Sequence, residues 1–244
     1  FDKITQVLEK DVTATVHSVN RLTPTIIEVI VHAPLQAQNF KPGQFYRLQN
    51  FETLAKEING VKLLTEGIAL TGAWNDPEKG LLSMIILEMG TSSRLCAALK
   101  PGEPVVVMGP TGTPTEIPKN ETVLLAGGGL GNAVLFSIGK AMKQNGNKVL
   151  YFAGYKDSQD IFKQDEVEVG TDVVIWSNDM GDAIKPRRPQ DKSFTGNIVQ
   201  AMLNYSEGKL GDTPIALNEV DRVIVIGSDR MMAAVKQARF GRSE

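Results

Sequence analysis

The stretch that decides the fold is Thr122-Val-Leu-Leu-Ala-Gly-Gly-Gly-Leu-Gly-Asn132, in which a short apolar run breaks into glycines. The apolar run predicts a buried strand, and the residues that follow predict an amphipathic helix. Glycine has no Cβ, so a phosphate can approach the loop amides and the helix N-terminus. The loop residues Gly127, Gly128, Gly129, Leu130 and Gly131 are therefore predicted to bind a nucleotide. The spacing is only close to the dinucleotide fingerprint, because Asn132 stands where a third glycine is expected.

Composition limits the protein class. The chain has 244 residues, enough for two modest hydrophobic cores, and the pattern of apolar residues and glycines changes near Pro118. A formal net charge of -2 gives no reason to expect a nucleic-acid or anionic membrane partner. The single cysteine, Cys96, excludes an internal disulfide, and an iron-sulfur cluster or cysteine-rich zinc site within this chain.

Export of this chain is not expected from its sequence. No apolar run approaches the roughly 20 residues that span a bilayer, and the N-terminus lacks the layout of a signal peptide. We therefore expect no insertion into a membrane, and we expect a cytoplasmic location. The chain begins with Phe1 and stops at Glu244, soon after a predicted helix, which suggests a processed form or a piece of a longer protein.

The N-terminal half reads as short strands with one buried face. Apolar and polar residues alternate with a period of two, and Pro-Gly and Asn-Asp-Pro signals separate the runs. Strands are predicted at residues 12–16, 25–33, 44–48, 68–74, 81–87 and 105–108, with one helix at 92–99. Such a pattern predicts a six-stranded antiparallel barrel over residues 1–117.

The C-terminal half alternates strand, glycine and helix. Continuously apolar strands are predicted at 123–126, 149–155, 172–176 and 223–226, with helices after the glycine loop and at 160–166, 196–203 and 229–238. This order predicts a Rossmann-like parallel-sheet domain over residues 118–244, with ligands at the carboxyl ends of the strands. The basic segment 181–193 is interpreted as a solvated loop in preference to a docking patch for an acidic partner.

Four segments resemble the ferredoxin-NADP reductase superfamily in order and spacing along nearly the whole chain. They are Pro42-Gly-Gln-Phe45, Gly90-Thr-Ser-Ser-Arg-Leu95, Gly127-Gly-Gly-Leu-Gly131 and Ile226-Gly-Ser-Asp-Arg-Met231. Within the superfamily the chain looks most like FAD-containing electron-transfer subunits, of the dihydroorotate dehydrogenase and NADH-dependent ferredoxin:NADP oxidoreductase small-subunit types. The resemblance implies FAD on the barrel and NAD(P)H on the α/β domain.

The resemblance implies an FAD site on two parts of the barrel. Gly90, Thr91, Ser92 and Ser93, before and within the barrel-side helix, would receive the FAD pyrophosphate, although Thr91 and Ser92 serve equally well as helix caps. The cations expected to neutralise this phosphate, and the backbone expected to face the flavin ring, are Arg47, Arg94, Ala69, Leu70 and Thr71.

Two positions depart from the pattern of the superfamily. Relatives carry Arg-x-x-Ser on the flavin strand, whereas this chain reads Glu66-Gly-Ile-Ala69, a carboxylate that would repel a pyrophosphate and a methyl that forms no hydrogen bond. Either Arg47 and Arg94 compensate or flavin binding is weakened. Relatives also end their last strand in Cys-Gly-Pro, and here Ile226 replaces the cysteine.

The resemblance implies a nicotinamide site at the strand ends of the α/β domain. Gly227, Ser228 and Met231 keep the family's spacing, although Ser228 also suits a helix cap. Asn178 and Asp179 are expected on the nicotinamide side of this site. Lys156 and Asp157 offer one group for a 2′-phosphate and one for ribose hydroxyls, so the sequence leaves NADH and NADPH open.

The leading hypothesis is an FAD-dependent NAD(P)H oxidoreductase domain that passes electrons to an iron-sulfur or flavoprotein partner. Hydride transfer between nicotinamide and flavin requires no protein acid or base, so no catalytic residue and no metal ligand is expected. Relatives of the electron-transfer type carry a 2Fe-2S cluster after the last helix, which places such a cluster beyond Glu244. The rival hypotheses are a flavin-free docking module and an NAD(P)H-binding sensor.

Overall fold

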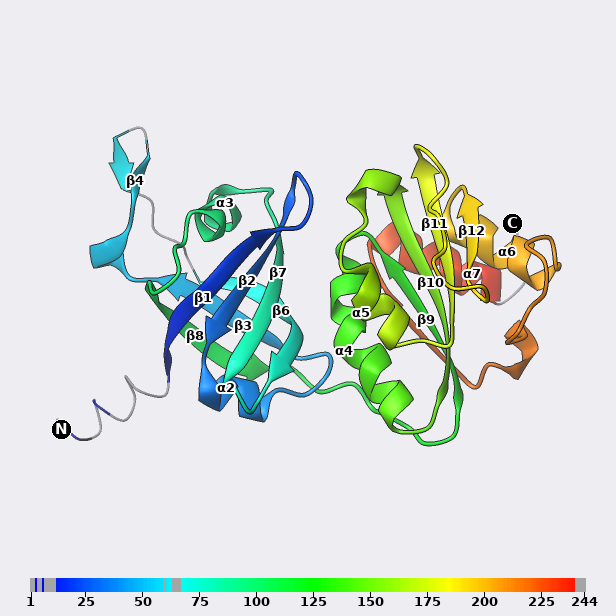
Figure 1. Ribbon diagram of the computed structural model, residues 1–244, viewed down its shortest axis with the longest axis horizontal. Helices are drawn as coiled ribbons and strands as arrows, with labels where there is room; N and C mark the ends of the chain where they lie inside the picture. Colours follow the sequence, from blue (N-terminus) through cyan, green and yellow to red (C-terminus); the bar gives the residue numbers. More distant parts are fainter. Residues whose placement is uncertain (1–2, 4–5, 7–11, 59, 63–66, 240–244) are drawn as a thin grey trace. The chain divides into compact units, whose positions relative to one another are not determined.

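The computed structural model describes residues 3, 6, 12–58, 60–62 and 67–239 (Figure 1). The chain divides into two compact units, Phe1–Thr115 and Glu116–Glu244, and each has its own hydrophobic core. This boundary lies two residues before the one expected from the sequence. Among the described residues, no helix is long and apolar enough to cross a membrane.

The first unit is a closed barrel of six antiparallel strands in the order β1-β2-β7-β6-β3-β8. The strands are β1 (Thr13–Arg21), β2 (Ile26–His32), β3 (Phe45–Asn50), β6 (Ile68–Asp76), β7 (Leu81–Leu87) and β8 (Pro104–Thr111). Alternate residues such as Ile27, Val29 and Val31 fill the interior, as the period of two predicts. The barrel prediction is confirmed, and β7 has the predicted bounds.

The barrel also contains elements that the sequence pattern did not predict. A short helix, α2 (Pro34–Asn39), follows β2 and begins with proline, which the first helical turn tolerates. A 3-10 turn, η1 (Glu52–Leu54), precedes a small hairpin of β4 (Glu57–Ile58) and β5 (Val61–Lys62). These elements are too short to produce a hydrophobic period, so they leave no signal in the sequence.

The one predicted barrel-side helix is present as α3 (Thr91–Ala97). Its Cys96 is buried in the barrel core, which confirms the interpretation of this residue as a small apolar side chain. Burial raises the pKa of the Cys96 thiol to about 12, so the reactive thiolate is scarce at neutral pH.

The second unit is a five-stranded parallel sheet in the order β12-β11-β10-β9-β13. The strands are β9 (Thr122–Gly128), β10 (Lys148–Asp157), β11 (Val173–Met180), β12 (Lys192–Thr195) and β13 (Arg222–Ile226). On one face lie α4 (Gly131–Gln144) and α5 (Gln164–Val169), and on the other α6 (Ile198–Ser206) and α7 (Asp229–Arg239) (Figure 1). A 3-10 turn, η3 (Leu217–Glu219), precedes β13. The Rossmann-like prediction is confirmed.

One predicted helix is displaced. The sequence pattern placed it at residues 160–166, whereas the structure has a 3-10 turn, η2 (Ser158–Asp160), and α5 from Gln164. The Asp157 carboxylate caps η2 by accepting a hydrogen bond from the Gln159 amide, and Lys163 has a left-handed φ of 51°. Local capping therefore separates the two elements, and hydrophobic period alone could not show the break.

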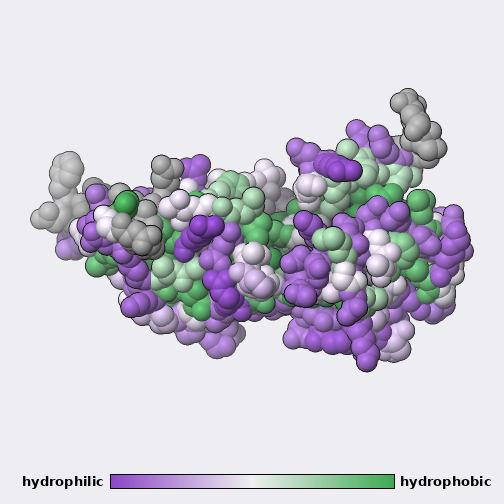
Figure 2. Space-filling model, turned by 90° about the horizontal axis from the view of Figure 1, so that it is seen from above, coloured by the Kyte–Doolittle hydropathy of each residue, from purple (hydrophilic) through white to green (hydrophobic). Residues whose placement is uncertain are grey.

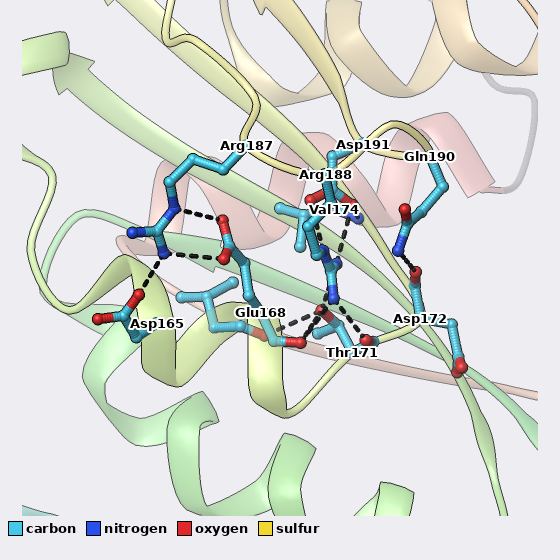
Figure 3. Close-up of polar contacts among 10 residues, drawn as sticks. Asp165, Glu168, Thr171, Asp172, Val174, Arg187, Arg188, Gln190 and Asp191 are labelled. Carbon is cyan, nitrogen blue, oxygen red and sulfur yellow. Dashed lines mark hydrogen bonds and ion pairs between the residues drawn. The ribbon is translucent and has the colours of Figure 1, made fainter.

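The loop before β12 holds two of its arginines in ion pairs within the unit (Figure 3). Arg187 forms ion pairs with Glu168 and Asp165 of α5. Arg188 binds both carboxylate oxygens of Asp191, at 2.7 and 2.8 Å, and donates to the carbonyls of Glu168 and Thr171. The segment is therefore an exposed loop, as interpreted, but Arg187 and Arg188 are bound within the unit.

The surface is mixed in character. On the face drawn in Figure 2, hydrophilic residues predominate and hydrophobic residues show between them in small groups. Scattered exposed apolar side chains are normal on folded proteins, so these groups alone mark no site.

Candidate nucleotide-binding sites

The glycine loop lies at the point where the order of the parallel sheet reverses. Strand β9 has β10 on one side and β13 on the other, and the chain leaves β9 for α4 and β13 for α7, on opposite faces of the sheet. In open α/β sheets this switch point is where ligands bind. A cavity of about 760 Å³ opens there over the carboxyl ends of the strands.

Six of the predicted nucleotide-binding residues line this cavity. They are Gly128, Gly129, Lys156, Asp179, Ser228 and Met231. The other predicted residues, Gly127, Leu130, Gly131, Asp157, Asn178 and Gly227, are not among those that line it.

Two glycines of the loop are required by packing. A Cβ on Gly127 would lie 2.1 Å from Asn132 Oδ1, and a Cβ on Gly131 would lie 2.4 Å from the Ile226 carbonyl oxygen. Gly129 has a left-handed φ of 54° and open space beside it. The loop is thus closely packed at Gly127 and Gly131, whereas the space beside Gly129 is open.

Asn132 holds the glycine turn in place. Its side chain is fully buried, and its Nδ2 donates to the carbonyls of Gly129 and Gly154, at 2.9 and 3.2 Å. Its Oδ1 accepts from the Tyr151 hydroxyl at 2.7 Å, and the Gly129 amide also donates to the Gly154 carbonyl. Burial, and secondarily Tyr155, raise the pKa of Tyr151, which therefore remains a hydroxyl donor. The residue that departs from the fingerprint is thus a positioning residue, a role that no local sequence pattern indicates.

The end of β13 approaches the glycine loop closely. A Cβ on Gly128 or on Gly227 would lie 2.3 or 2.5 Å from the Met231 sulfur, so this thioether covers both glycines. The Ser228 hydroxyl accepts from the Met231 amide at 3.3 Å, which supports its interpretation as a helix cap. Arg230, in the first turn of α7, also lines the cavity and was not predicted.

Two residues were predicted to bind the nucleotide at the end of β10 and two at the end of β11. One residue of each pair lines the cavity. Asp157 is engaged in the cap of η2, and the buried Asn178 donates from Nδ2 to the Met180 and Asp182 carbonyls at 2.7 and 3.0 Å. Lys156 and Asp179 line the cavity, and neither forms an ion pair with any residue in the described part of the chain.

Asp179 and Gly227 lie at opposite sides of the cavity. Strands β10 and β9 lie between β11 and β13, so three strand spacings, about 14 Å, separate the two strand ends. The assignment of Asn178 and Asp179 to the nicotinamide side stays a prediction.

The sequence pattern did not predict that residues at the start of α6 line the cavity. Asn197 and Gln200 line the cavity and form a capping box, in which each side chain accepts from the other's amide at 3.0 and 3.1 Å. The spacing of Asn197 and Gln200 before an apolar run is a recognisable signal for a helix start. Ser177 also lines the cavity. The sequence pattern could not predict this, because it depends on the direction in which the side chain faces on β11.

The predicted FAD residues at α3 fall into two groups. The Ser93 hydroxyl is buried and accepts from the amides of Met89 and Gly90, at 3.0 and 2.9 Å, so Ser93 supplies the helix cap. Thr91 and Arg94 are exposed and Ser92 is half-buried. A Cβ on Gly90 would meet nothing within 4 Å, so its backbone is open to a ligand.

The predicted FAD residues of the barrel strands lie on β3 and β6. Arg47 pairs with Ala69 in the ladder, and both are exposed on the outer face, whereas Leu70 points into the barrel core and Thr71 is half-buried. Arg47 has no ion-pair or side-chain hydrogen-bond partner in the described part. Glu66 lies outside the described residues. No group of three or more His, Cys, Asp or Glu side chains in the described part could hold a metal ion.

The arrangement is the fold of ferredoxin reductases. A solved NADH-dependent reduced ferredoxin-NADP oxidoreductase superposes with a TM-score of 0.73 and 23% identity, covering 93% of this chain and 72% of the other. The ferredoxin reductase of carbazole 1,9a-dioxygenase superposes with a TM-score of 0.65 and 21% identity, covering 94% and 65%. No family model matches the sequence.

Sequence relatives support the same class. The chain is 44% identical to an uncharacterized protein of Rickettsia prowazekii over 154 residues, 63% of this chain and 20% of that protein. It is 30% identical over 160 residues to the dihydroorotate dehydrogenase B (NAD(+)) electron transfer subunit homolog of Thermotoga maritima, 65% of this chain and 53% of that one. The resemblance to the ferredoxin-NADP reductase superfamily is confirmed. The matched region spans about half of the Thermotoga relative.

Proposed function

We propose that the chain is an FAD-dependent NAD(P)H oxidoreductase module that exchanges electrons among nicotinamide, flavin and a partner. The observation that carries this proposal is the braced glycine turn at the switch point, beside a cavity of about 760 Å³, in a chain with a ferredoxin reductase barrel. Cavities of this size are typical of small-molecule and cofactor sites.

The α/β unit supplies the groups that a dinucleotide requires. The turn leaves open space beside Gly129, where a pyrophosphate could approach, and Lys156 and Arg230 bring positive charge to the same cavity. Neither cation forms an ion pair with a carboxylate in the described part of the chain. These two cations would therefore supply the positive charge that a pyrophosphate requires.

The outer face of β3 and β6 offers groups that a flavin nucleotide could use. Arg47 has a guanidinium without a partner in the described part of the chain, and it can bind phosphate oxygens in a fork. Beside it, a Cβ on Gly67 would meet no atom closer than 3.9 Å, and Ala69 presents only a methyl. Small residues leave the strand backbone open to a planar ring.

The chain's own contribution to the reaction is binding and orientation. When bound, FAD would accept a hydride from NAD(P)H and release electrons onward one at a time. The protein groups need only hold both nucleotides and exclude water, so the proposal assigns no acid, base or nucleophile to the chain.

The partner is proposed from the relatives. Those with names are electron-transfer subunits of dihydroorotate dehydrogenase B, which implies a separate catalytic subunit for them. We assign this chain an iron-sulfur or flavoprotein acceptor of the same kind, with a 2Fe-2S cluster supplied outside residues 1–244. Ala69, exposed where the superfamily has a serine, favours the alternative of a flavin-free nucleotide-binding module.

The visible spectrum of the purified protein separates these two functions. We expect flavin absorbance and a stoichiometry near one FAD per chain, directly or after addition of FAD. Arg47→Ala is expected to weaken FAD binding about tenfold or more, because a charge-assisted hydrogen bond contributes about 1.5–3 kcal/mol.

The matched control is Arg21→Ala, which removes a barrel arginine that is already paired with Glu88. FAD affinity is expected to be unchanged in this variant. A colourless protein that takes up no added FAD would contradict the proposed function and support the flavin-free module.

A further inference from the structure

The Met231 side chain forms part of the cavity wall beside the glycine loop. A Cβ on Gly128 would lie 2.3 Å from the Met231 Sδ, and one on Gly227 would lie 2.5 Å from it, so the sulfur occupies the space that both glycines leave free. Met231 is half-buried in the first turn of α7 and lines the cavity. A small solute in the cavity can therefore reach this side chain.

An oxygen atom added to the Met231 sulfur could take one of two places. Toward Gly128 and Gly227 the contact is too close even for one further carbon atom, so an oxygen there would push the side chain off the loop. On the cavity side the oxygen would lie where a pyrophosphate is proposed to approach Gly129. A thioether is apolar, whereas a sulfoxide is polar and its oxygen carries partial negative charge, which repels an anion. Oxidation of this sulfur therefore weakens the binding of an anionic nucleotide in either case.

The other sulfur-containing residues lie away from this cavity. All eight methionines belong to the described part of the chain, and Met231 alone among them lines the cavity. Met89 and Met180 are 78% and 51% exposed and lie outside it. Cys96 is fully buried, and burial raises the pKa of its thiol to about 12, so it supplies little of the reactive thiolate. An effect of sulfur oxidation on the cavity wall is therefore an effect of Met231.

We propose that Met231 is a modification site at which hydrogen peroxide switches off nucleotide binding. One peroxide molecule transfers one oxygen atom to the sulfur: the O–O bond breaks, an S–O bond forms, and water leaves. The sulfur loses two electrons and the peroxide gains them. Methionine sulfoxide reductases reverse this change, so the modification is reversible. This inference rests on the proposed nucleotide-binding function.

The test compares the NADH dissociation constant of the full chain before and after treatment with hydrogen peroxide. Peptide mass spectrometry measures the fraction of Met231 that carries one added oxygen, and isothermal titration gives the dissociation constant. We expect the affinity for NADH to fall about tenfold or more as Met231 becomes oxidised. The affinity is expected to return after treatment with methionine sulfoxide reductases A and B, which together reduce both epimers. Tryptophan fluorescence is expected to stay unchanged, because the fold is retained.

Met231→Leu and Met232→Leu are the matched variants. The first has no sulfur at the cavity, so its NADH affinity, whatever its starting value, is expected to be the same before and after peroxide. The second keeps Met231 and removes the neighbouring sulfur, which belongs to a residue that is 37% exposed and does not line the cavity. Its affinity should fall after peroxide as in the unsubstituted protein.

Three results would overturn the inference while leaving the proposed function intact. They are an unchanged NADH affinity with Met231 oxidised, an equal loss of affinity in Met231→Leu, and a Met231 that stays unoxidised while Met89 is fully oxidised. The first and third need no variant to fold. Loss of the folded state on oxidation would also overturn the inference. An untreated protein that binds neither NADH nor NADPH would instead remove the proposed function.

Discussion

Replacement of Arg188 by alanine is expected to lower the free energy of unfolding of the α/β unit by about 3–5 kcal/mol. The Asp191 side chain is 0% exposed and is bound by both guanidinium branches of Arg188. Its Oδ1 also accepts from the Val174 amide of β11 at 2.8 Å. Without the arginine a buried carboxylate loses its counter-charge, and β11 loses the anchor of the segment that leads to β12 (Figure 3).

Arg187→Ala is the matched control, since it removes the neighbouring guanidinium. The Arg187 side chain is 44% exposed, and exposed ion pairs contribute about 1 kcal/mol or less. Urea unfolding followed by tryptophan fluorescence measures both variants, because Trp176 of β11 is fully buried and reports on this unit. Equal losses of unfolding free energy in the two variants would show that the buried Arg188–Asp191 pair stabilises the unit no more than the exposed ion pairs of Arg187.

Replacement of Asn132 by alanine is expected to weaken NADH binding at least tenfold and to lower the free energy of unfolding by about 2–4 kcal/mol. The substitution removes the Nδ2 donor from the backbone carbonyls of Gly129 and Gly154, and it removes the Oδ1 acceptor from the Tyr151 hydroxyl. The glycine turn would then be free to leave the conformation that presents its backbone to the cavity.

Tyr151→Phe separates the two effects of Asn132. It removes the hydrogen bond to Asn132 Oδ1 and leaves both bonds from Nδ2 to the turn. We expect a loss of about 1 kcal/mol in stability and NADH affinity within twofold of the unsubstituted protein. Isothermal titration with NADH and urea unfolding give both quantities. An affinity loss in Tyr151→Phe as large as in Asn132→Ala would contradict the positioning role.

Much of the fold could be predicted because its signals are local. Strand alternation gave the six barrel strands, and the strand-glycine-helix rhythm gave the parallel sheet. The short α2 and the polar strand β12 were missed, because neither has an apolar period to detect. Proline at the start of α2 and the Lys192–Thr195 composition are equally compatible with loops.

Only the parts of the site that lie within one continuous segment of the chain could be predicted. The glycine loop and the Gly227 strand end were found from their own residues. The roles of Asn132 and Ser177 depend on Gly154, which neighbours them through the pairing of β10 with β9 and β11. Sheet order and register decide such contacts, and they also place Asp179 far from Gly227. None of this is visible in a linear pattern.

The proposed function requires this chain to move a hydride from a nicotinamide to a flavin that it holds. An anaerobic titration of the FAD-loaded protein with NADH, followed at the flavin absorbance band, tests this step. We expect the band to bleach completely with about one NADH per bound FAD. A flavin band that persists under an excess of both NADH and NADPH would rule the proposed function out.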